Sequence, residues 1–267
     1  MPRNLKLTLE YEGTAYHGWQ VQPNGFTIQE VVECVLERLT GVRPKVIASG
    51  RTDAGVHAEG QVAHFHADCP ISCGKFRKGL NALLPDDIVV REVEEVPLEF
   101  HARFSAVGKT YRYVILNRSF PSVFERNRCW LINRPLDTAA METAGRCLVG
   151  RHDFSSFRAS DCCAKHPVRE IHRLDVVRED DWIRLFISAD AFLQHMVRNI
   201  VGTLVEVGRG KIPPEKVKEI LDARDRRKAG PTAPPGGLFL QSVEYGEGLR
   251  RRRGKGEDGA AQDSRCR

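Results

Sequence analysis

The sequence predicts an α+β fold in which mainly antiparallel strands form a sheet and helices pack on it. Segments that alternate apolar and polar residues, as half-buried strands do, recur along the chain. Some follow one another through short turns and others are separated by helical segments, whereas a doubly wound parallel sheet needs a helix between successive strands. The composition is globular, with 41% hydrophobic and 28% charged residues, and no apolar run approaches the roughly 18 residues of a membrane span.

The first half of the chain is predicted to run strand–helix–strand–strand–helix–strand. Thr27 and Glu30 have the spacing of a capping box that opens a helix, and Gly41 supplies its end. The expected strands are 5–11, 46–49, 61–66 and 88–96, and the expected helices are 28–39 and 74–84.

The second half repeats this rhythm loosely. Asp137 is a plausible N-cap for one of its helices. The expected strands are 110–117, 171–177, 182–189 and 238–245, and the expected helices are 137–149, 192–207 and 214–223. These patterns predict an N-terminal α+β half (1–107), a C-terminal α+β half (108–246) and a disordered, arginine-rich tail (247–267).

Three general features of the sequence restrict the possible functions only weakly: its net charge, its cysteines and its first residues. The formal net charge is +6, and half of it belongs to residues 247–267, so a polyanion site in the body has to be a local patch. The eight cysteines contain no C-x-x-C pair, which predicts free thiols rather than disulfides or zinc ligands. A strand pattern begins directly after the first residues, so no signal peptide is expected and we predict a cytoplasmic protein without a membrane anchor.

The densest set of chemically capable side chains lies in the segment 48–58, between two predicted strands. It contains Arg51, Asp53 and two hydroxyl residues beside Gly50 and Gly55, where the glycines let a ligand approach the backbone. An aspartate in such a loop serves as nucleophile or base when a nearby cation keeps it ionised. The alternative is an ordinary turn in which Asp53 caps the backbone.

Two further segments are candidates. Alternation puts Lys109, Tyr111 and Tyr113 on one face of their strand, which suits stacking on a nucleobase, although a tyrosine strand packed in a core is common. In the predicted helix 192–207, apolar residues surround a narrow polar strip that includes Arg198. A buried arginine needs a carboxylate partner, which is either a structural pair or a device that keeps an aspartate ionised.

Together these segments resemble the tRNA pseudouridine synthase A family, over residues 3–246. The motifs that carry the resemblance are Tyr11-Glu12-Gly13, Gly18-Trp19-Gln20, Thr27-Ile28-Gln29, Gly50-Arg51-Thr52-Asp53-Ala54-Gly55-Val56-His57-Ala58, Lys109-Thr110-Tyr111-Arg112-Tyr113, His152-Asp153-Phe154, Met196-Val197-Arg198-Asn199-Ile200-Val201-Gly202, Ala229-Gly230-Pro231-Thr232-Ala233-Pro234 and Gly237-Leu238. The arginine-rich tail lies outside the family pattern.

The resemblance implies isomerisation of uridine to pseudouridine at positions 38, 39 and 40 of the tRNA anticodon stem-loop, with no cofactor and no metal. Asp53 matches the catalytic aspartate, which attacks the ribose as nucleophile or removes its 2′ proton. Tyr111 matches the tyrosine that stacks on the target base, and Arg198 the arginine that pairs with the aspartate. Arg51 matches the residue that takes the place of the flipped base, and Leu238 the apolar wall of the pocket.

The resemblance also implies two ferredoxin-like halves whose sheets join, and a homodimer that binds one tRNA across both subunits. Four bases, Arg51, Lys109, Arg112 and Arg198, are expected around Asp53. Two alternatives remain from the residues: a non-catalytic RNA-binding module and a nucleoside hydrolase. Asp53 argues against simple binding because a carboxylate repels phosphate, and no second water-activating group supports a hydrolase.

Overall fold

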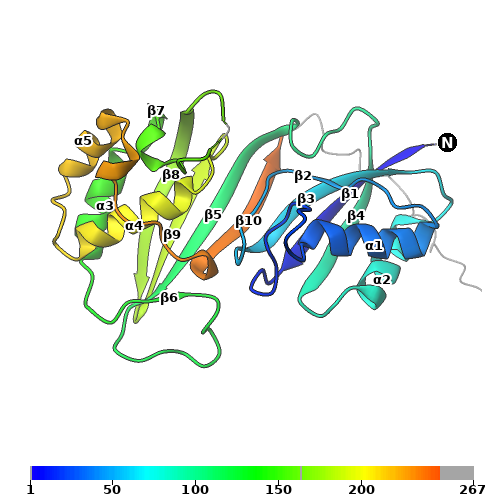
Figure 1. Cartoon of the computed structure of the whole chain (residues 1–267), viewed down its shortest axis with the longest axis horizontal. Helices are drawn as coiled ribbons and strands as arrows, with labels where there is room; N and C mark the ends of the chain where they lie inside the picture. Colours follow the sequence, from blue (N-terminus) through cyan, green and yellow to red (C-terminus); the bar gives the residue numbers. More distant parts are fainter. Residues whose placement is uncertain (1, 163, 247–267) are drawn as a thin grey trace, which may run out of the picture.

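The computed structural model describes residues 2–162 and 164–246, and the predicted tail, with Cys163, lies outside them. A ten-stranded sheet runs through the molecule in the order β4-β1-β3-β10-β5-β9-β8-β7, with β2 beside β3 and β6 beside β5 (Figure 1). The strands are β1 (Arg3–Tyr11), β2 (Ile47–Ala48), β3 (His57–Ala67), β4 (Ile88–Val96), β5 (Ala106–Leu116), β6 (Trp130–Leu131), β7 (Gly150–Asp153), β8 (Val168–Glu179), β9 (Trp182–Ala189) and β10 (Leu238–Tyr245).

The pairing of the strands confirms the predicted α+β class with a mainly antiparallel sheet. Among the strands of residues 2–162 and 164–246, only the pairs β3–β10 and β5–β6 are parallel. The last strand, β10, pairs with β3 through Phe239 and Leu240, which joins the early strands to the late ones. The division near residue 107 stays a prediction, because the sheet continues across it.

The five α-helices of the described residues cover one face of this sheet, α1 and α2 over the early strands and α3 to α5 over the late ones (Figure 1). Their bounds are α1 (Ile28–Thr40), α2 (Cys73–Leu83), α3 (Thr138–Arg146), α4 (Met196–Gly208) and α5 (Lys216–Ala223). The caps are those that the sequence predicts: Thr27 accepts from the Glu30 amide, Asp137 accepts from the Ala140 amide, and Gly41 ends α1 at a φ of 79°.

The structure differs from the sequence prediction at the start of α4. The helix begins at Met196, not at residue 192, because the Met196 amide closes a turn with the Leu193 carbonyl and His195 adopts a left-handed φ of 61°. The strands β6 and β7, of two and four residues, were not predicted, since so short a segment carries almost no alternation.

Other predictions concern thiols, metals and membranes. Cys34, Cys69, Cys73, Cys129, Cys147 and Cys162 are free. Within residues 2–162 and 164–246, no group of three or more His, Cys, Asp or Glu side chains is arranged to hold a metal ion. None of the helices in this same part of the chain has the length and apolar character to cross a membrane.

Candidate active site

The loop that leads to Asp53 is held from below by buried side chains of β1 and β3. Gln61 on β3 accepts from the Ser49 hydroxyl at 2.8 Å and donates to the Gly50 carbonyl at 2.9 Å. Gln61 also donates to the Tyr11 hydroxyl at 3.3 Å, and that hydroxyl bonds to the Thr52 hydroxyl at 2.8 Å. Tyr11 and Gln61 are buried, so this network fixes residues 49–52 without solvent competition.

The segment after β1 packs against the other side of the same loop. The Trp19 amide donates to the Thr52 carbonyl at 3.1 Å. Gly18 has a φ of +85°, and a Cβ built there would lie 2.5 Å from the Thr52 oxygen, so only glycine fits. The Val56 amide bonds back to the Asp53 carbonyl at 3.1 Å and closes the turn.

Asp53 is half-buried and faces two basic side chains at the start of α4. Its Oδ2 accepts a hydrogen bond from Arg198 Nη1 at 3.0 Å, and His195 Nε2 lies 3.4 Å from the same oxygen. Among the residues that the structure describes, none donates a hydrogen bond to Asp53 Oδ1. Oδ2 of the carboxylate is thus held by the Arg198 guanidinium, while Oδ1 accepts no hydrogen bond from the described residues.

The Arg198 guanidinium is itself oriented by the backbone. Its Nε donates to the Ala233 carbonyl at 2.8 Å, and the Ala233 amide donates to the Arg198 carbonyl at 3.0 Å. The segment 229–234 can lie this close to α4 because position 202 is glycine: a Cβ there would meet the Pro231 oxygen at 1.7 Å. The predicted pairing of Arg198 with an aspartate is therefore part of a rigid arrangement in this structure.

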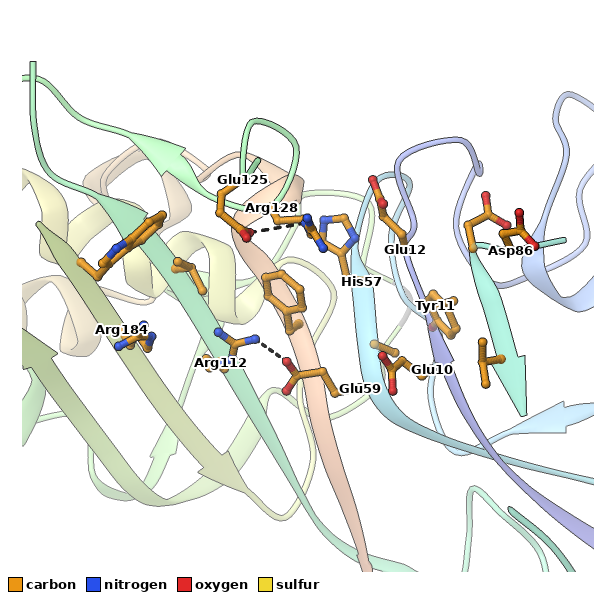
Figure 2. A pocket seen from close by; sticks show the side chains of 16 residues that line it. Glu10, Tyr11, Glu12, His57, Glu59, Asp86, Arg112, Glu125, Arg128 and Arg184 are labelled. Atoms are coloured by element: carbon orange, nitrogen blue, oxygen red, sulfur yellow. Dashed lines mark hydrogen bonds and ion pairs between the residues drawn. The ribbon is translucent and has the colours of Figure 1, made fainter. Parts of the chain in front are cut away.

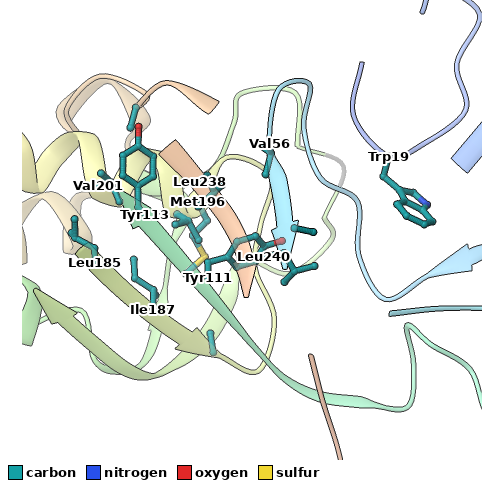
Figure 3. Close-up of a cluster of buried hydrophobic side chains, with 14 of the residues drawn as sticks. Trp19, Val56, Tyr111, Tyr113, Leu185, Ile187, Met196, Val201, Leu238 and Leu240 are labelled. Atoms are coloured by element: carbon teal, nitrogen blue, oxygen red, sulfur yellow. The ribbon is translucent and has the colours of Figure 1, made fainter. Parts of the chain in front are cut away.

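Tyr111 lies on β5 on the same face of the sheet as Asp53. It is 8% exposed, and its ring meets Phe192 edge-on at a centroid distance of 5.0 Å. Burial raises the pKa of its hydroxyl above the ordinary value, and the nearby Asp53 carboxylate adds to this, so the phenol stays neutral. Figure 3 shows Tyr111 in one buried cluster with Met196, Leu238 and Leu240.

Leu238 begins β10, opposite Tyr113, and is 5% exposed. The residues just before it approach the Asp53 loop, since a Cβ on Gly55 would lie 3.1 Å from the Pro235 ring. Arg51 differs from the other candidates: it is exposed, and it makes no ion pair within the described part of the chain. The structure thus brings Asp53, Arg198 and Tyr111 together and leaves Arg51 in solvent.

The expectation that Arg112 lies near Asp53 is wrong. Strand alternation turns it to the opposite face of the sheet, where it pairs with Glu59 and its guanidinium lies 4.5 Å from the Phe239 ring centroid (Figure 2). A hollow of about 520 Å³ on that face is lined by mixed charges, including Glu10, Glu125 and Arg184. So many carboxylates would repel a polyanion, so this hollow does not resemble a polyanion site.

Lys109, which the sequence places on the face of Tyr111, is part of the site's frame. Its Nζ donates to the Ser49 carbonyl at 2.6 Å, directly below the Asp53 loop. Asn199, on the same helix as Arg198, is instead structural: its side chain bonds to the Phe157 carbonyl at 2.8 Å and to Thr232 at 2.7 Å. Near the start of this helix, His195 and Arg198 therefore face Asp53, and Asn199 supports the fold.

Comparison with known proteins agrees with this geometry. Residues 8–105 and 144–246 match the family model described as tRNA pseudouridine synthase. A tRNA pseudouridine synthase A of Myxococcus xanthus is 51% identical over 98% of this chain and 99% of its own length. That of Geobacter sp. (strain M21) is 50% identical over 92% of this chain and 100% of its own length.

Likeness to solved structures is much weaker. The archaeal box H/ACA sRNP Nop10-Cbf5 complex aligns with 84% of this chain and 60% of that chain, at 11% identity and a TM-score of 0.31, which carries no argument about function. The two relatives found by sequence, by contrast, align with more than nine-tenths of this chain and are identical to it at about half of the aligned positions. The chain belongs to the tRNA pseudouridine synthase family, whose enzymes isomerise uridine to pseudouridine in tRNA.

Proposed function

We propose that the chain isomerises uridine at positions 38, 39 and 40 of the tRNA anticodon stem-loop, with Asp53 as the nucleophile. The observation that supports this most directly is the Asp53 carboxylate, held through Oδ2 by Arg198 at 3.0 Å with Oδ1 free. In this scheme Oδ1 is the atom that attacks the ribose C1′.

The isomerisation conserves every heavy atom of the substrate, so the protein has to supply one nucleophile and a place to hold the base. As Oδ1 bonds to C1′, the bond from C1′ to N1 breaks and its electron pair leaves with the uracil. The uracil turns, C5 bonds to C1′, and the carboxylate is released. The proton lost from C5 is balanced by the one that N1 gains.

The detached uracil must stay in the site and away from water. Tyr111 offers a buried aromatic ring and Leu238 an apolar side chain in the same cluster, and we assign them to the floor and wall of the uracil pocket. A uridine in the stem must first leave the base stack, at a cost of a few kcal/mol. Arg51, exposed two residues before Asp53, is assigned to fill the space that the flipped base leaves.

The resemblance also leads us to propose a homodimer that binds one tRNA across both subunits, in the cytoplasm where tRNA is used. Sedimentation or light scattering of the purified chain, alone and with tRNA, tests the assembly. Two protomers and one tRNA per complex are expected. A complex of one protomer with one tRNA that is fully active would contradict the proposed dimer.

The decisive experiment is incubation with an unmodified tRNA transcript, followed by mapping of pseudouridine. Conversion at positions 38, 39 and 40 is expected from the wild-type protein and none from Asp53→Asn. Conversion that survives this substitution rules out Asp53 as nucleophile. Binding without conversion would favour the RNA-binding module, and release of free uracil would favour a hydrolase.

A further inference from the structure

Lys109 is a half-buried basic residue for which the described part of the chain provides no acid. Its Nζ donates to one carbonyl, that of Ser49 at 2.6 Å, and within the described residues no carboxylate lies within ion-pair distance. Burial, with the nearby positive charge of Arg103, lowers its pKa to about 8. Burial of an ammonium without a counter-charge destabilises a protein, so the position calls for an anion that arrives from outside.

Two more basic side chains without acidic partners, Arg51 and Arg103, lie beside Lys109. Arg51 follows Gly50, where an added Cβ would lie 2.9 Å from Lys109 Nζ. Arg103 is close enough to affect the titration of Lys109, and neither arginine forms an ion pair in the part of the chain that the structure describes. By contrast Arg112, on the other face of the same strand, is paired with Glu59. The uncompensated positive charge is thus concentrated at the entrance to the Asp53 loop.

Arg103 and its neighbour Phe104 are held outward by a tight turn. His101 Nδ1 accepts hydrogen bonds from the amides of both residues, each at 3.2 Å. The Ser105 amide donates to the His101 carbonyl at 2.9 Å, which closes the turn. The His101 and Phe104 rings pack against each other, tilted by 31° with their centroids 4.3 Å apart, and yet the phenylalanine is 76% exposed. An exposed aromatic side chain on a rigid turn beside bases is a typical platform for a nucleobase.

We propose that Lys109 and Arg103 form a subsite for a backbone phosphate of the RNA next to the target uridine, and that Phe104 stacks on a flanking base. The inference rests on the proposed function, since tRNA is the polyanion concerned. A phosphodiester bound between the side chains of Lys109 and Arg103 supplies the missing counter-charge and accepts hydrogen bonds from the remaining N–H donors of Lys109. This contact also holds the RNA strand in place at the point where the target nucleotide has to leave the base stack.

The test is the salt dependence of tRNA binding, measured in the Asp53→Asn background so that no turnover occurs. Each lost phosphate contact is expected to reduce the slope of log Kd against log salt by about 0.7 to 0.9. Lys109→Met and Arg103→Met are each expected to show this reduction, and Lys109→Arg to keep the slope. The matched control is Arg91→Met, an exposed base that donates to the Glu59 carbonyl on the opposite face and whose loss should leave the slope unchanged.

Phe104→Ala is expected to weaken tRNA binding by about 5-fold or more with no change in slope, because stacking carries no charge. Melting temperatures of the free proteins show whether each variant is folded. Suppose that folded Lys109→Met shows an unchanged slope and, in the protein that keeps the wild-type Asp53, slower turnover. Lys109 would then only position the loop, and the proposed phosphate subsite would be overturned. Turnover by Asp53→Asn itself would contradict the proposed function and leave the slope measurements valid.

Discussion

Arg198 and Asp53 are 145 residues apart in sequence, and one N–H of the arginine lies 3.0 Å from one oxygen of the aspartate. The orientation of the guanidinium is fixed, because its Nε donates a hydrogen bond to the Ala233 carbonyl at 2.8 Å. The arginine therefore selects which carboxylate oxygen is held and which is free. This geometry leads to the first prediction.

Arg198→Lys is expected to lower kcat by about 10-fold to 100-fold, because an ammonium cannot bind Asp53 Oδ2 and the Ala233 carbonyl in the same planar arrangement. Single-turnover rates on tRNA transcripts measure the chemical step. The Kd for tRNA is the internal control and should change by less than about 3-fold. A variant that turns over at the wild-type rate would show that charge alone, without orientation, suffices.

Arg51→Ala is expected to slow turnover by about 10-fold or more while the Kd for tRNA changes much less, since base flipping is part of the catalytic step. Stability should not change, because the side chain is exposed and makes no ion pair with the described residues. Arg91→Ala, which removes an exposed base from the opposite face, is the matched control for charge. Equal losses in turnover and binding by Arg51→Ala would contradict the assigned role.

The pKa of Lys109, about 8 against an ordinary 10.5, predicts a pH-dependent stability. Below pH 8 the ammonium is charged in both the folded and the unfolded state, and its burial lowers the free energy of unfolding. Between about pH 8 and 10.5 the folded protein loses this proton first, so that cost declines as pH rises.

Lys109→Met is therefore expected to be as stable as wild type or more stable at pH 7, by up to about 1 kcal/mol, since partial exposure screens the charge. The advantage should shrink toward pH 10. Urea unfolding at both pH values measures it, with Lys109→Arg as the variant that keeps a charge throughout. If Lys109→Met were the less stable protein at pH 7, the bond to Ser49 would be the dominant effect of the lysine.

Gly18→Ala and Gly41→Ala form a matched pair of glycine substitutions. Both glycines have positive φ, +85° and +79°, but a Cβ at Gly18 meets the Thr52 oxygen at 2.5 Å while nothing lies within 4 Å of one at Gly41. Backbone strain alone should cost about 1 kcal/mol at Gly41, and strain plus the clash about 3 kcal/mol at Gly18. Thermal unfolding measures both losses, and equal values would mean that the loop yields to the methyl group.

The sequence alone determined the elements whose patterns are local. The helix from Ile28 and the strands 88–96, 182–189 and 238–245 follow from periodicity and caps, because these depend on neighbours a few residues away. The motifs also identified the family, and with it Asp53, Tyr111 and Arg198 as candidates. Their roles are still predictions that the experiments above test.

Only the tertiary structure decided which side chains meet. Helical periodicity extended the predicted helix back to residue 192, whereas α4 begins only at Met196, and His195 Nε2 lies 3.4 Å from Asp53 Oδ2. Alternation put Lys109 and Arg112 on opposite faces of β5, but only the assembled sheet shows which face carries the Asp53 loop. Contacts between residues far apart in the chain depend on how the sheet is ordered, and no local pattern encodes the pairing of β10 with β3.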